Sequence, residues 1–174
     1  MLLIDTHCHL DLDDFVQDRG EVLQNARKSG VAGIVIPGIA RAGWPRLIEL
    51  CRSATDLYPA LGLHPCFVDH HQQGDLVGLQ QTIEQEKPVA VGEIGLDFYR
   101  PELSKEQQLG LFEAQLSIAK AADLPVILHN RKAHDQMLSL LRKARVKGGI
   151  CHAFNGSLQQ AQQYMDLGFK LGFG

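Results

Sequence analysis

Short apolar runs alternate with amphipathic stretches along the whole chain. The runs have strand length, and some are apolar at almost every position, which is typical of parallel strands covered on both faces. Between them, apolar residues recur every three or four positions, as on the inner face of a helix. We expect strands over residues 2–5, 31–37, 58–63, 88–92, 124–128, 149–151 and 169–173, and helices over 21–29, 45–55, 75–85 and 131–144 and behind Ser104 and Ser157. This alternation predicts an α/β fold with a parallel sheet and right-handed crossovers.

Polar residues capable of chemistry stand at the ends of several of these runs. In a TIM barrel the functional residues lie at the carboxyl ends of several different strands, whereas an open doubly wound sheet gathers them near one switch point. The sequence has no glycine-rich phosphate loop behind its first run. It therefore predicts a TIM (β/α)8-type barrel. The residues concerned are His7, His9, His64, Glu93, His129 and His152.

The length of 174 residues fits a single domain with a core of its own. A complete barrel usually has about 250 residues, and this sequence stops within the seventh expected strand. We therefore expect residues 1–174 to form one barrel domain whose C-terminal part lies beyond this sequence. An incomplete barrel is the alternative.

Charge and cysteine content narrow the class of protein. With a net charge of −3 the chain lacks the excess of positive charge that tight, non-specific binding of nucleic acid requires. An enzyme could still act on nucleic-acid ends at a local metal site. The four cysteines form no C-x-x-C pair and do not suggest a disulfide framework. Neither a signal peptide nor a run of membrane-spanning length is visible. We expect a cytoplasmic protein with no membrane contact and no obligate protein partner.

The histidine-rich run ends suggest metal binding. Alternation along a strand directs His7 and His9 to the same side, where two imidazoles can hold one ion or simply form ordinary hydrogen bonds. Imidazole nitrogens suit zinc, manganese, cobalt, nickel or iron better than magnesium or calcium. Glu93 stands between Gly92 and Gly95, and its two carboxylate oxygens could bridge two cations.

Several further residues have two open interpretations. His64 could contact a substrate phosphate or a metal, or serve the structure alone. Arg131 could bind a phosphate or begin a helix in solvent. Asp97 could orient a ligand histidine or cap the next loop, and Asp5 is expected to form hydrogen bonds rather than bind metal. His134 is expected on a helix surface, and we find no aromatic platform for stacking bases.

Five ordered motifs together resemble the TatD family of metal-dependent hydrolases, in particular its YjjV-like members. They are DTHCHL at 5–10, GLHP at 62–65, GEIGLDFY at 92–99, PVILHNR at 125–131 and CHAFNGS at 151–157. The resemblance implies a TIM barrel and metal-dependent hydrolysis of phosphodiester bonds, since several members are DNases and some are 3'-to-5' exonucleases. It implies two divalent metal ions, with zinc favoured over manganese, cobalt or magnesium, and DNA or another phosphodiester as substrate. The implied ligands are His7, His9, Glu93, His129 and His152, with Glu93 bridging the ions and His64 near the substrate.

The sequence departs from the family pattern in one respect. The family carries a catalytic aspartate after its eighth strand, beyond the last residue here. Three hypotheses follow. The chain is a phosphodiesterase that uses Glu93 and His64 and a binuclear centre to activate water; it is an amide or ester hydrolase for a small substrate; or it binds metal without turnover.

Overall fold

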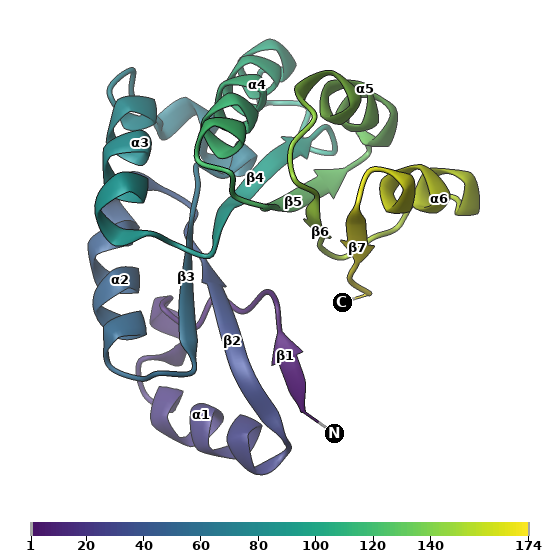
Figure 1. Ribbon diagram of the computed structural model, residues 1–174. Coiled ribbons are helices and arrows are strands. Elements are labelled where there is room, and N and C mark those ends of the chain that lie inside the picture. Colours follow the sequence, from purple (N-terminus) through teal and green to yellow (C-terminus); the bar gives the residue numbers. More distant parts are fainter. Residues whose placement is uncertain (1, 174) are drawn as a thin grey trace.

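A single parallel sheet curls through the molecule, and helices cover its outer face (Figure 1). The computed structural model describes residues 2–173. Its strands pair in parallel and in chain order from β1 to β7. They are β1 (Leu3–Asp5), β2 (Val31–Pro37), β3 (Leu57–Leu61), β4 (Ala90–Asp97), β5 (Val126–Arg131), β6 (Gly149–Cys151) and β7 (Phe169–Leu171). The curl and the strand order confirm the predicted barrel-type α/β fold.

The helices connect successive strands, as the alternating pattern predicted. They are α1 (Arg19–Lys28), α2 (Trp44–Arg52), α3 (Asp75–Glu86), α4 (Lys105–Ala121), α5 (His134–Ala144) and α6 (Leu158–Asp166). Short 3-10 turns cover Asp13–Phe15, Arg41–Gly43 and Pro65–His70. No helix within residues 2–173 has the length and apolar character needed to cross a membrane.

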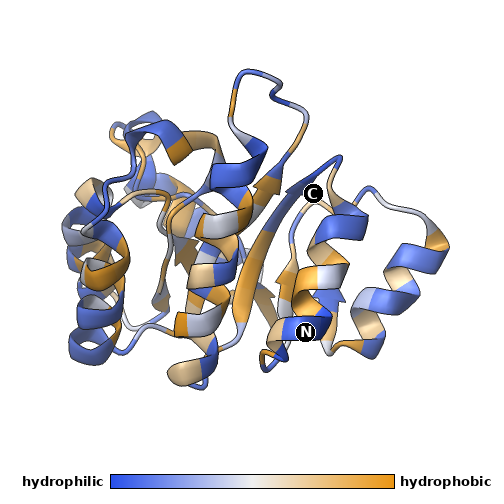
Figure 2. Ribbon diagram, turned by 90° about the horizontal axis from the view of Figure 1, so that it is seen from above, coloured by the Kyte–Doolittle hydropathy of each residue, from blue (hydrophilic) through white to orange (hydrophobic). Residues whose placement is uncertain are grey.

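Apolar side chains fill the space between the sheet and the helices. In Figure 2 the strands between the helices are largely hydrophobic, and much of the helix surface is hydrophilic. β4 is buried along its whole length, because β3 and β5 flank it and α4 packs against it. Phe112 and Leu116 of α4 are almost fully buried in this layer. The core therefore rigidly supports the strand that carries Glu93.

β4 is longer than the expected strand over 88–92, because its glycines continue the strand instead of starting a loop. At Gly95 the backbone has φ +147°, and a Cβ atom there would lie 2.0 Å from the carbonyl oxygen of His129. Glycine alone allows β4 and β5 to approach so closely. The register pairs Gly95 with His129 and Asp97 with Arg131, so the polar ends of the two strands lie side by side.

β5 is also longer than expected, because it extends to Arg131 and α5 begins only at His134. The expected helix over 131–144 was therefore wrong at its start. Lys132 adopts a positive φ of 54°, which turns the chain between the two elements. Arg131 consequently stands at a strand end rather than in the first turn of a helix.

Two buried glutamines of α4 hold the ends of β3 and β4. The Gln115 side chain accepts from the Leu63 N–H at 2.7 Å and donates to the Leu63 carbonyl at 3.0 Å. Gln108 makes the same pair of bonds with the backbone of Asp97, at 2.7 and 3.1 Å. Buried backbone groups at strand ends need such partners. The backbone just before His64 and the end of the strand that carries Glu93 are thereby attached to α4.

We predict that Gly95→Ala lowers the free energy of unfolding by about 3 kcal/mol, because the new methyl group collides with the β5 backbone at a positive φ. Gly110 of α4 is a matched control, since nothing lies within 4 Å of the position that a Cβ atom would take there. Gly110→Ala should raise the stability by about 0.5–1 kcal/mol through helix propensity. Urea unfolding of both variants measures the difference. Equal stabilities would contradict the close approach of β4 and β5.

Candidate metal centre

The side chains predicted from the run ends converge on the carboxylate of Glu93. Oε2 lies 3.1 Å from His9 Nε2, 3.3 Å from His7 Nε2 and 3.6 Å from His64 Nε2. Oε1 lies 3.3 Å from His129 Nδ1. Glu93 has only 2% of its side chain exposed. One buried carboxylate therefore faces imidazoles that come from three other strand ends.

His152 completes the group from the turn behind β6. Its ring stacks on that of His7, with centroids 3.5 Å apart and planes 7° from parallel. The side chains open into a pocket of about 420 Å³. Its lining comprises His7, His9, His64, Glu93, His129, Asn130, Arg131, His152, Ala153 and Asn155. The structure thus brings all the expected ligands, His64 and Arg131 to one pocket.

Asp5 and Asp97 each contact a residue of the pocket lining. Asp5 Oδ1 accepts a hydrogen bond from the His7 N–H at 3.0 Å. Asp97 is fully buried, and its Oδ2 lies 2.9 Å from His129 Nε2. The outer nitrogen of His9, Nδ1, lies 3.0 Å from the Pro37 carbonyl oxygen, which accepts its N–H hydrogen bond. Such contacts fix the ring orientation and leave the inner nitrogens free to bind a cation.

The charges of the group depend on burial and on these contacts. Burial would raise the pKa of Glu93, but its contacts with His129, His64, His7 and His9 hold that pKa well below its usual value. Burial would lower the pKa of His129, but contacts with Cys66, Glu93 and Asp97 raise it to about 10. Burial and the neighbouring His7 lower the pKa of His152 to about 4. The site therefore contains a permanent buried anion.

The donor set fits a metal ion. The ligand atoms of His7, His9 and Glu93 lie within 4.8 Å of one another. The two imidazole nitrogens, 3.1 Å apart, both face the carboxylate. His7 Nδ1 is buried and has no hydrogen-bond partner among the described residues. Imidazoles around a carboxylate are the ligands that zinc and transition metals prefer.

His134 was expected on a helix surface, and that expectation was wrong. It is 9% exposed, because its ring packs against the rings of Phe154 and Tyr164. Asn130 Nδ2 donates to Tyr164 OH at 2.8 Å and lies 2.9 Å from His134 Nδ1. His134 Nε2 in turn lies 3.1 Å from Asn155 Oδ1. This network links the chain beside His129 to the turn that carries His152.

Sequence reasoning missed Asn130 and Asn155 as lining residues and gave Cys66 no role. The asparagines carried a usable signal, since each closely follows an expected ligand, His129 or His152. Cys66 stands two residues after His64, but the turn that directs its sulfur inward could not be read from the sequence pattern.

A barrel-type sheet with imidazoles and a buried carboxylate at its carboxyl edge defines a class of protein, the metal-dependent hydrolases. Within that class the chain belongs to the TatD family: the family model described as TatD related DNase matches residues 4–174. The family resemblance expected from the five motifs is therefore confirmed.

Individual relatives agree with this assignment. The chain is 43% identical over 174 residues to the uncharacterized metal-dependent hydrolase YjjV of Escherichia coli, covering 98% of this chain and 67% of the relative. The crystal structure of E. coli YjjV matches with a TM-score of 0.92 and 42% identity, over 97% of this chain and 66% of that one. A protein of Erwinia tasmaniensis named 3'-5' ssDNA/RNA exonuclease TatD is 31% identical, over 98% of this chain and 67% of its own length. The chain spans about two thirds of the length of these relatives.

In the metal-free chain, we predict that His129 is protonated and His152 neutral at about pH 8, because their pKa values lie on opposite sides of the usual value near 6.5. Ring ¹⁵N chemical shifts followed over pH measure both. For the same reason the His129 contribution to metal-free stability should be complete below about pH 6.5 and be lost as the pH rises through its folded pKa. Titration of both rings near pH 6.5 would contradict the described contacts.

We predict that Asn130→Ala lowers the free energy of unfolding by about 2–3 kcal/mol, because it removes the buried hydrogen bond to Tyr164 OH and leaves the buried Ala133 N–H without its partner. Gln162→Ala is the control, since the hydrogen bond of Gln162 to Asp166 is exposed. That change should stay within about 0.5 kcal/mol. Thermal and urea unfolding provide the comparison, and equal losses would mean that the buried network does not stabilise the fold.

Proposed function

We propose that this chain is a metal-dependent phosphodiesterase that acts on single-stranded nucleic acid from the 3' end. The observation that carries the proposal is the division of contacts around Glu93. One carboxylate oxygen faces His7 and His9, and the other faces His129. A buried carboxylate with imidazoles on both sides is suited to bridge two cations.

In this proposal His7, His9 and Glu93 would hold one ion, and Glu93, His129 and His152 would hold a second. Zinc is the favoured metal because most donors are imidazoles, with manganese, cobalt or magnesium as alternatives. Two divalent ions held in this way would activate a water molecule and neutralise charge that develops on the phosphoryl group. Family membership supports the requirement for metal, and the ligand roles are our assignment.

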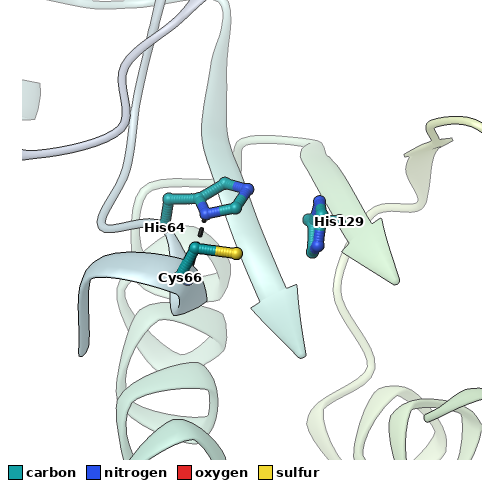
Figure 3. A group of neighbouring side chains, drawn as sticks. All are labelled: His64, Cys66 and His129. Atoms are coloured by element: carbon teal, nitrogen blue, oxygen red, sulfur yellow. Dashed lines mark hydrogen bonds between the residues drawn. The ribbon is translucent and has the colours of Figure 1, made fainter. Parts of the chain in front are cut away.

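The protein's own residues would bind and orient the substrate. His64 borders the pocket beside Glu93, and contacts with Cys66 and Glu93 raise its pKa although burial opposes this. Because Nδ1 accepts from the Cys66 N–H at 3.1 Å (Figure 3), the neutral ring carries its proton on Nε2, which can donate a hydrogen bond to a phosphate oxygen, and this is the role we assign to His64. Asp97 would keep His129 oriented, and Asp5 would hold the backbone of His7.

A small cationic surface beside the pocket supports a phosphate-containing chain as substrate. The Arg131 guanidinium lies 4.1 Å from the ring centroid of Tyr99, and Lys132 Nζ lies 4.9 Å from it. Tyr99 is 53% exposed, at the edge of the molecule. Because cations already lie over the ring, we assign Tyr99 to holding Arg131 rather than to stacking a base. Relatives named as 3'-5' ssDNA/RNA exonucleases support the choice of nucleic acid and of direction.

A small amide or ester substrate remains the second candidate. It is favoured by the net charge of −3, which provides little attraction for a long nucleic acid. Rates on single-stranded oligonucleotides, aryl esters and N-acyl amino acids, measured with the same metal-loaded sample, separate the two. Faster turnover of a carbonyl substrate than of every phosphodiester would contradict our first choice.

The metal requirement is tested by reconstitution. We predict that the chain binds about two equivalents of zinc and cleaves a labelled single-stranded oligonucleotide only when loaded. Glu93→Gln should bind less metal and lose at least about 100-fold in kcat. Glu113→Gln, on the exposed outer face of α4, is the control and should change neither. Metal-independent cleavage would refute the mechanism, and two bound ions without cleavage would refute the activity while leaving the metal centre intact.

The role of Arg131 is tested by replacing it and measuring oligonucleotide cleavage and binding. We predict that Arg131→Ala raises KM for an oligonucleotide about 10-fold with little change in kcat, because a charge-assisted phosphate contact is lost. The slope of the logarithm of oligonucleotide affinity against the logarithm of salt concentration should become shallower by about one, as expected for the loss of one phosphate contact. Arg142→Ala on the outer face of α5 is the matched control. An unchanged KM and salt dependence would exclude a phosphate contact at this position.

A further inference from the structure

A buried polar network connects β5, α5 and α6 beside the pocket. Its members are Asn130 near the end of β5, His134 at the start of α5 and Tyr164 of α6. All three side chains are buried. His134 Nε2 lies 3.1 Å from Oδ1 of Asn155, which lines the pocket. A buried network that ends on one pocket residue can fix the orientation of that residue.

The backbone at Ala133 determines which way the Asn130 amide faces. Asn130 Oδ1 accepts from the Ala133 N–H at 3.2 Å, because a backbone N–H can only donate. The other amide atom, Nδ2, therefore faces the network and donates to Tyr164 OH at 2.8 Å and to His134 Nδ1 at 2.9 Å. The Tyr164 hydroxyl, which accepts from Asn130, is 3.3 Å from His134 Nδ1 and can donate to it as well. His134 Nδ1 is thus the acceptor in both contacts.

This arrangement fixes the tautomer of His134 and, through it, the amide of Asn155. With Nδ1 accepting, the neutral ring carries its proton on Nε2. Nε2 then donates to Asn155 Oδ1. Because the oxygen and nitrogen of an amide diverge from one carbon, Asn155 Nδ2 is turned away from the buried ring. Within residues 2–173 this nitrogen has no hydrogen-bond partner.

The turn that carries Asn155 is itself held in place. It follows β6, and its Phe154 N–H donates to the Gly172 carbonyl at 2.7 Å. The Phe154 ring packs edge-on against the rings of His134 and Tyr164, with centroids 5.3 and 5.9 Å away. Asn155 therefore presents its free N–H groups from a fixed position in the pocket lining.

We propose that Asn155 is a substrate-binding residue whose Nδ2 donates a hydrogen bond to a phosphate oxygen in the pocket, and that His134 positions it. The inference rests on the proposed function, because it places a phosphodiester beside Glu93. His64 and Arg131 border the same pocket and would donate from other elements of the fold. A neutral amide held by a neutral imidazole adds a directed donor without a further charge in the pocket.

Two substitutions separate substrate binding from a role in the fold alone. Asn155→Asp keeps the oxygen that accepts from His134 and replaces the proposed donor with an acceptor, whereas Asn155→Ala removes both. We predict that each lowers kcat/KM for a labelled single-stranded oligonucleotide at least about tenfold in the zinc-loaded chain. Metal content and urea unfolding check that both variants keep the centre and the fold. Asn25→Asp, at an exposed position of α1, makes the same change of charge and should leave kcat/KM unaltered.

The pattern of the two variants decides the result. Unchanged kcat/KM in Asn155→Ala would overturn the proposal. A loss in Asn155→Ala with unchanged kcat/KM in Asn155→Asp would overturn it too, because only the contact with His134 would then matter.

Nuclear magnetic resonance of the unaltered chain tests the same assignment without turnover. At about pH 8, where an ordinary imidazole is neutral, the ring ¹⁵N shifts of His134 should show the proton on Nε2. Thymidine 5'-monophosphate added to the zinc-loaded chain should shift the side-chain N–H signals of Asn155. A proton on His134 Nδ1, or Asn155 signals that do not respond, would overturn the proposal. Both expected signatures in a chain that cleaves no oligonucleotide would refute the proposed activity and leave the phosphate contact of Asn155 intact.

Discussion

The contact between the buried carboxylate of Glu93 and the imidazoles around it is the interaction on which the site depends. An ionised carboxylate that is 2% exposed is unfavourable unless cationic or hydrogen-bonding partners surround it. Here those partners come from the ends of β1, β3 and β5. A curled parallel sheet is the arrangement that brings the ends of several strands to one point. The fold and the chemistry are thus linked through one residue.

The supporting contacts ensure that these ends meet accurately. Gly95 lets β4 and β5 approach, and the α4 glutamines hold the backbone near His64 and behind Glu93. Asp97 orients His129, and the network around His134 ties the neighbourhood of His129 to that of His152. None of these groups needs to touch a substrate. Together they decide how closely the donors approach one another, which in turn determines whether a metal can bind.

Much of the architecture could be predicted from the sequence, because the strand–helix alternation is strongly expressed and the histidines stand at run ends. The residues at which β4 and β5 end could not be predicted, because Gly95 resembles a loop residue until its close contact with β5 is known. His134 was misjudged because its burial depends on where α5 starts, which the apolar pattern locates only approximately. The position of the Cys66 sulfur depends on a 3-10 turn, which has no periodic signal.

The most direct test of the account is anomalous diffraction from crystals of the zinc-loaded chain. We predict two peaks about 3.5–4 Å apart that both contact Glu93. One should lie beside His7 and His9, and the other beside His129 and His152. A single peak, or peaks that do not contact the Glu93 carboxylate, would contradict the bridging role on which the proposed function rests.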